Sequence, residues 1–169
     1  PAFVINGNSL ESDLPFLGRA ATDWTVCSRY FAPIMASTWP NRIYQHSGVT
    51  DRLDNDPVPS FLPTIWDRLA AAKLDGRYYF SDTPFLGIWG PGKYAPIMHS
   101  YSQFLADCAS GDLPEVAFVD PPFNGEESGT SGDDHPHADI RAGESWLSDT
   151  YRAVTTSPEW KHTVMVINF

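Results

Sequence analysis

The chain has 169 residues, 42% of them hydrophobic and 19% charged, with 11 Lys and Arg against 21 Asp and Glu. This length fits one domain, or a piece of a larger one, with a substantial core. The formal net charge of -10 argues against nucleic-acid binding through phosphate contacts, and no apolar run is long enough for a transmembrane segment.

The N-terminal part of the chain predicts a helix, a strand and a polar loop. Residues 13–21 are predicted to form a helix that leads into a short strand over 24–27. Residues 37–48, "STWPNRIYQHSG", are predicted to form a shaped loop. Pro40 restricts its own φ and lacks a donor, and it favours an extended conformation at Trp39.

The rest of the chain alternates helices with short apolar strands. The predicted elements are a helix over 63–74, a turn and strand over 75–80, a helix over 95–111, a strand over 116–119, a helix of about four turns within 140–160 and a last strand over 161–169. This order predicts an α/β fold with a mainly parallel sheet and helices on its faces. We expect 116–119 and 163–167 to be buried parallel strands of one sheet.

Polar segments follow the predicted strands. Asp120 comes directly after the strand over 116–119, and the polar stretch "NGEESGTSGDD" occupies 124–134. Ligands of open parallel sheets bind beyond the carboxyl ends of the strands. The sequence therefore predicts a ligand site at this rim of the sheet.

The stretch "GDDHPHAD", residues 132–139, gathers three carboxylates and two imidazoles: Asp133, Asp134, His135, His137 and Asp139. These groups have the chemistry to hold a divalent metal or to bind a phosphoryl group. The alternative is structural, with Asp134 capping the following turn and both histidines on the surface. Both interpretations stay open on the sequence alone.

Several other polar residues have a structural interpretation. His46 and His99 are isolated histidines beside predicted elements, and His162 is expected to flank the last strand. Cys27 and Cys108 are far apart and form no metal-binding motif. They are either a disulfide or two buried thiols.

Thr38 is a candidate nucleophile because its hydroxyl stands beside the polar pair Asn41 and Arg42. A hydroxyl near a proline also serves ordinary turn chemistry. The local sequence does not decide between these roles.

The segments "DLPFL", "TVCSRYF", "STWPNRIYQHSG", "PTIWDRL", "LPEVAFVDPPF", "DDHPHADIRAGESWLSDTYRAV" and "SPEWKHTVMVINF" occur in this order. Over nearly the whole chain they resemble a bacterial phosphoesterase family, which includes phosphatidylcholine-hydrolysing phospholipases C and a metal-dependent acid phosphatase. Its members are similar in fold to alkaline phosphatases. The most specific part of the resemblance is the pair of motifs T-x-P-N-R and D-D-H-P.

The resemblance implies metal-dependent hydrolysis of a phosphate ester, such as a phospholipid, through a covalent phosphothreonine. It assigns Thr38 as the nucleophile and a metal neighbour, and His135 as a catalytic part of the phosphate pocket. Asn41 and Arg42 would belong to the substrate-binding loop and mainly shape it around Thr38. It implies no role for His137. The resemblance also implies that the metal is a divalent ion and that the protein is secreted or periplasmic.

Two family elements are absent from the sequence. Family members open with a Glu-Asn-Arg-Ser-Phe-Asp-His type segment and continue, after the last strand, into an Asp-Glu-x-Gly-Gly element, and both supply metal ligands. We therefore expect residues 1–169 to be the central segment of a single catalytic domain, with an incomplete alkaline-phosphatase-like fold and little activity alone. The alternative is a truncated or degenerate module that binds a phosphate or sugar ligand without turnover.

The implied chemistry also makes a geometric prediction. A nucleophile and a phosphate-binding imidazole must reach the same phosphoryl group. The side chains of Thr38 and His135 should therefore lie within about 10 Å of each other at the carboxyl-end rim of the sheet.

Overall fold

The structure, a computed structural model, describes residues 14–168. A three-stranded parallel sheet in the order β2-β1-β3 lies at its centre. The strands are β1 (Gly76–Phe80), β2 (Met98–Ser100) and β3 (Val116–Val119). Tyr79 of β1 is paired with His99 on one side and with Val119 on the other. All three strands therefore end at the same edge of the sheet.

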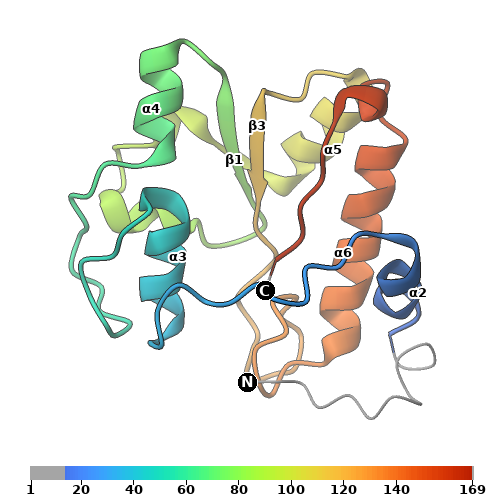
Figure 1. Cartoon of the computed structure of the whole chain (residues 1–169), viewed down its shortest axis with the longest axis horizontal. Helices are drawn as coiled ribbons and strands as arrows, with labels where there is room; N and C mark the ends of the chain where they lie inside the picture. Colours follow the sequence, from blue (N-terminus) through green and yellow to red (C-terminus); the bar gives the residue numbers. More distant parts are fainter. Residues whose placement is uncertain (1–13, 169) are drawn as a thin grey trace.

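Helices cover both faces of this sheet (Figure 1). The α-helices are α2 (Pro15–Asp23), α3 (Thr38–Ser47), α4 (Ile65–Ala72), α5 (Tyr101–Ser110) and α6 (Ile140–Thr155). Short 3-10 helices are η1 (Phe85–Trp89), η2 (Ala95–Ile97) and η3 (Trp160–His162). In Figure 1, α3 and α4 lie on one side of the strands, and α2, α5 and α6 lie on the other.

The two faces bury adjacent tyrosines of β1. Tyr78 and Tyr79 are both fully buried, and successive side chains of a strand point to opposite faces. Tyr78 packs with Ile43 of α3 and the apolar residues of α4, whereas Tyr79 packs with Phe104 of α5 and Val154 of α6. This arrangement confirms the predicted α/β class with helices on both faces, and it is consistent with an alkaline-phosphatase-like architecture.

The predicted loop over 37–48 was wrong, because residues 38–47 form α3. Pro40 is the third residue of this helix. The first turn of a helix has N–H groups without intrahelical acceptors, so a proline there sacrifices no hydrogen bond. Gly48 ends the helix in the left-handed conformation, with φ of 71°, which glycine adopts without strain.

Two predicted strands are not present in the structure. Residues 24–27 have no strand, and neither have residues 163–167, although 116–119 was predicted correctly as β3. Val164 and Val166 are 88% and 80% exposed. An apolar run signals a strand only if a neighbour pairs with it, and nothing local encodes that neighbour. Phe169 and Asp13, the ends of two predicted elements, lie outside the described residues.

Other boundaries moved by a few residues. The predicted helix over 95–111 is divided into η2, the short strand β2 and α5. The helix predicted within 140–160 ends at Thr155, and His162 closes η3 instead of flanking a strand. β3 is also less buried than predicted, because it is an edge strand and Ala117 is exposed.

Candidate functional site

The carboxyl ends of β1 and β3 carry two aspartates that organise the rim. Asp120 directly follows β3, and Asp82 lies two residues after β1. The Asp82 carboxylate accepts hydrogen bonds from the backbone N–H groups of Phe123 and Asn124, at 3.1 and 2.7 Å. Figure 1 places the first turn of α3 and the 120–139 segment at the end of the molecule toward which β1 and β3 run.

Thr38 is the first residue of α3 and is exposed. The side chain of Ser37, the N-cap residue, makes no capping hydrogen bond. The N–H of Trp39 donates to Oδ1 of Asn55 at 2.8 Å, and Pro40 has no N–H. Because Thr38 is exposed, its hydroxyl is accessible at the N-terminal end of the helix, where the helix dipole favours an anion.

Asn41 uses its side-chain amide within its own loop. Its Oδ1 accepts from the N–H of Ile34 at 3.3 Å, and its Nδ2 donates to the carbonyls of Ala36 and Ser37 at 3.3 and 3.0 Å. These bonds fasten the segment that enters α3. They support the loop-shaping role implied by the resemblance, whereas substrate binding by Asn41 stays a prediction.

Replacing Asn41 should loosen this segment. Asn41→Asp keeps the shape but loses both donors and sets a carboxylate against two carbonyls, so we expect the free energy of unfolding to fall by about 1–3 kcal/mol. Urea denaturation at pH 7 measures this. Ser37→Ala is the control, because its hydroxyl caps nothing; equal stability of Asn41→Asp and wild type would contradict the interpretation.

Arg42 lies in the interior between two aromatic rings. Its guanidinium carbon is 4.5 Å from the ring centre of Phe85 and 4.9 Å from that of Phe123. The guanidinium also forms an ion pair with Asp120. The side chain is 17% exposed. Arg42 is therefore engaged by protein groups, and its predicted contact with substrate stays untested.

Asp120 collects two donors in a buried position. Its Oδ2 accepts from the guanidinium of Arg42 and from the hydroxyl of Tyr78. Burial raises the pKa of Asp120, and the charge of Arg42 opposes this shift. Burial, with the nearby Asp120 charge, also raises the pKa of Tyr78, so its hydroxyl remains a donor.

The polar side chains of residues 132–139 make separate local contacts and do not converge on one site. Asp133 accepts from the hydroxyl of Ser131 at 2.7 Å and from the N–H of His135 at 3.3 Å, so it closes the turn assigned to Asp134. Asp139 is the N-cap of α6. The side chain of His135 is 50% exposed, with Nδ1 3.3 Å from a Glu126 carboxylate oxygen. His137 is also exposed. The surface position predicted for both histidines is confirmed.

A metal centre does not assemble from these side chains. Across residues 14–168, no three His, Cys, Asp or Glu side chains are grouped so that they could hold a metal ion. Oδ1 of Asp134 is buried without a hydrogen-bond partner, but the nearby Glu144 carboxylate already accepts from the N–H groups of Phe16 and Leu17. Residues 14–168 therefore do not by themselves supply the ligands of a metal cage.

His46 and the two cysteines lie outside the candidate site. His46 is 2% exposed on α3, with its ring 4.7 Å from that of Phe118, which confirms the structural interpretation. Burial, assisted by the charge of Arg42, lowers its pKa from 6.5 to about 3. Cys27 is exposed and Cys108 is buried, and both are free thiols. Of the two alternatives for the cysteines, the disulfide is wrong and only Cys108 is a buried thiol.

The sequence predicted that Asp120 lies at the rim of the sheet, but it did not predict which residues donate hydrogen bonds to its carboxylate. The hydrogen bonds of Asp120 join the end of β3 to Tyr78 of β1 and Arg42 of α3. The available signal was a carboxylate at the end of an apolar strand, which is costly to bury unless donors surround it. No sequence feature near Asp120 identified Arg42 and Tyr78 as those donors.

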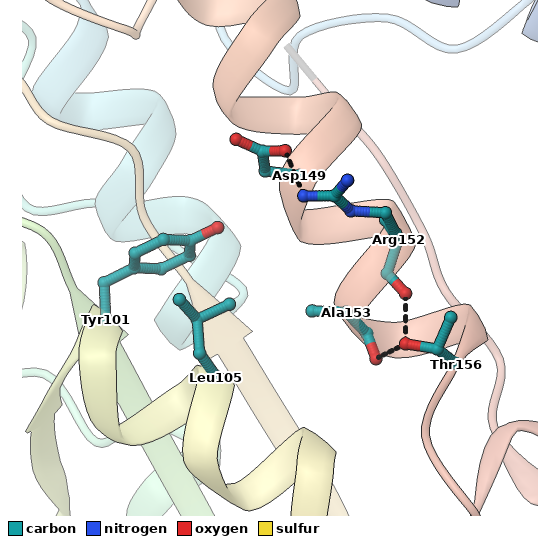
Figure 2. Close-up of a pocket in the computed structure, with 6 residues that line it drawn as sticks. All are labelled: Tyr101, Leu105, Asp149, Arg152, Ala153 and Thr156. Atoms are coloured by element: carbon teal, nitrogen blue, oxygen red, sulfur yellow. Dashed lines mark hydrogen bonds and ion pairs between the residues drawn. The ribbon is translucent and has the colours of Figure 1, made fainter.

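A shallow groove of about 340 Å³ lies between α5 and α6 (Figure 2). Its lining consists of Tyr101, Leu105, Asp149, Arg152, Ala153 and Thr156. Arg152 is paired with Asp149 at 3.1 Å. None of the predicted site residues lines this groove.

Residues 7–169 match the model of the Phosphoesterase family. Non-specific phospholipases C4 and C1 of Arabidopsis thaliana are 29% and 30% identical over 98% and 92% of the chain. The non-hemolytic phospholipase C of Pseudomonas aeruginosa is 28% identical over 94% of it.

The chain therefore belongs to the Phosphoesterase family, as the sequence motifs indicated. It covers 32%, 31% and 27% of the lengths of these three relatives, so it spans between about a quarter and a third of each. The relatives come from plants as well as bacteria, which broadens the bacterial resemblance. None of the helices within 14–168 is both long enough and apolar enough to cross a membrane.

Proposed function

We propose that the protein hydrolyses phosphate esters and that residues 1–169 belong to its catalytic domain. The observation that carries this proposal is the T-x-P-N-R motif, which forms the N-terminal end of α3 with Thr38 exposed and Asn41 and Arg42 anchored. An exposed hydroxyl at the positive end of the helix dipole is well suited to meet a phosphate group. Family membership and the phospholipase C relatives support the same activity.

In the proposed reaction, Oγ of Thr38 attacks phosphorus and the bond from phosphorus to the leaving alcohol breaks. The hydroxyl proton is lost as the oxygen attacks, and the leaving alkoxide takes up a proton. Water then cleaves the phosphothreonine and releases phosphate or a phosphomonoester. His135 would contribute to the pocket for the phosphoryl oxygens. A divalent metal, expected from the resemblance, would supply activation of the hydroxyl and charge neutralisation.

The names of the relatives favour a phosphodiester substrate in a phospholipid. A phospholipase C cleaves between glycerol and phosphate, so its products are a diacylglycerol and a phosphorylated head group. We propose this reaction for the whole protein, with a secreted or periplasmic location as the matching expectation.

The test is product release by the whole protein from phosphatidylcholine vesicles. We expect diacylglycerol and phosphocholine in equal amounts, with a rate that falls when divalent cations are chelated. Hydrolysis of p-nitrophenylphosphorylcholine but not p-nitrophenyl phosphate would identify a diesterase, and the reverse preference would identify a phosphatase. Phosphate binding without any turnover would favour the degenerate module instead.

A further inference from the structure

We propose that Asp120 is a positioning residue for Thr38 that acts through Arg42. This inference rests on the proposed function of Thr38. Thr38 and Arg42 are four residues apart on α3, so they lie on the same face in successive turns of the helix. The group that holds Arg42 therefore determines where the first turn of α3 lies relative to the sheet.

The guanidinium of Arg42 is held on several sides. Phe85 and Phe123 lie 4.5 and 4.9 Å from its central carbon, and Asp120 pairs with its Nη2. The Asp120 side chain is only 4% exposed. A guanidinium that is both stacked and ion-paired has little freedom to reorient, so α3 is anchored one turn below Thr38.

Asp120 is itself fixed to β1 through both backbone and side chain. Its N–H donates to the carbonyl of Tyr79 at 2.9 Å, and its carbonyl accepts from the hydroxyl of Ser81 at 3.1 Å. The Tyr78 hydroxyl, which donates to the carboxylate, accepts from the N–H of Phe85 at 2.9 Å. The anchor for α3 is therefore part of the central sheet.

The same anchor reaches the segment that carries His135. Phe123, one of the rings against Arg42, lies in the 120–139 segment, and its N–H is bound by Asp82. The network thus connects the helix of the proposed nucleophile with the segment of the proposed phosphate-binding imidazole. A displacement of about 1 Å at a reacting group can lower a rate by about 100-fold, so this connection bears directly on turnover.

A buried ion pair can also serve stability alone, and the chain contains a matched control for that role. Asp107 is 5% exposed, pairs with Arg77 at 2.9 Å and accepts from the Tyr79 hydroxyl at 2.6 Å. It reproduces the Asp, Arg and Tyr chemistry of Asp120, but it lies on α5, on the opposite face of the sheet from α3.

The experiment compares Asp120→Asn with Asp107→Asn by amide hydrogen exchange and by kinetics in the whole protein. For Asp120→Asn we expect about 10-fold faster exchange in residues 42–44 of α3, unchanged exchange in α5, and kcat lowered about 10- to 100-fold with KM within about 3-fold. For Asp107→Asn we expect kcat and the exchange of α3 to stay at wild-type values.

Each outcome decides the proposal. Faster exchange throughout the domain in both variants, or wild-type kcat and α3 exchange in Asp120→Asn, would overturn the positioning role. If the wild-type protein hydrolyses no phosphate ester, the proposed function fails separately, and the exchange measurement still decides whether Asp120 positions the first turn of α3.

Discussion

Thr38→Ala is expected to abolish hydrolysis of a phosphate ester by the whole protein, with kcat lowered by about 10,000-fold or more. Alanine has no oxygen to attack phosphorus, so no covalent intermediate forms. Because Thr38 is exposed and caps nothing in the structure, the free energy of unfolding should change by less than about 0.5 kcal/mol. Initial rates and urea denaturation measure the two effects.

Two variants control this prediction. Thr38→Ser retains the hydroxyl and should keep turnover within about 10-fold of wild type. Thr83→Ala removes the same atoms from another exposed threonine at the sheet rim and should leave kcat unchanged. Wild-type turnover in Thr38→Ala would show that the nucleophile is a different residue.

The stability of the protein should fall as the pH drops below about 6.5, and His46 should account for a defined part of the loss. The folded-state pKa of His46 is lowered from 6.5 to about 3 because the ring is buried beside the charge of Arg42. Between these values the unfolded chain binds a proton that the folded chain does not. Stability contributed by neutral His46 is therefore present above pH 6.5 and declines by about 1.4 kcal/mol per pH unit toward pH 3.

Urea denaturation of wild type and His46→Leu between pH 7.5 and 5.5 isolates this contribution. Wild type should lose about 1.4 kcal/mol more than the variant over this range, because leucine does not titrate. His162→Gln, a change at an exposed histidine, should follow the wild-type curve. If the free energies of unfolding of wild type and His46→Leu change with pH in parallel, His46 has the same pKa in the folded and unfolded chain, and the prediction is wrong.

The hydrogen bonds around Asp120 show that the family motif contains only some of the residues that build the site. T-x-P-N-R placed the candidate nucleophile at Thr38 and two supporting residues beside it, and these residues form the anchored N-terminal end of α3. The partner of Arg42 lies 78 positions away along the chain. No local spacing links these two residues, because the fold alone brings β3 beside α3.

The errors in secondary structure have the same origin. The local restrictions of Pro40 predict a loop, but its position in the first turn of α3 makes it compatible with a helix. The apolar run over 163–167 has the pattern of a strand, yet its side chains alternate between half-buried and exposed, and within residues 14–168 no strand pairs with it. Strand formation depends on a partner that the run itself does not contain.

By itself, the sequence determined the α/β class, the order of most helices and strands, and membership of the Phosphoesterase family. These follow from local periodicity and from motifs, which are written within short stretches of chain. The tertiary structure alone decided that Arg42 and Tyr78 both donate to the buried Asp120 carboxylate and that His46 is buried neutral. Burial, ion pairing and desolvation depend on which distant residues meet, and that is set only when helices pack on the sheet.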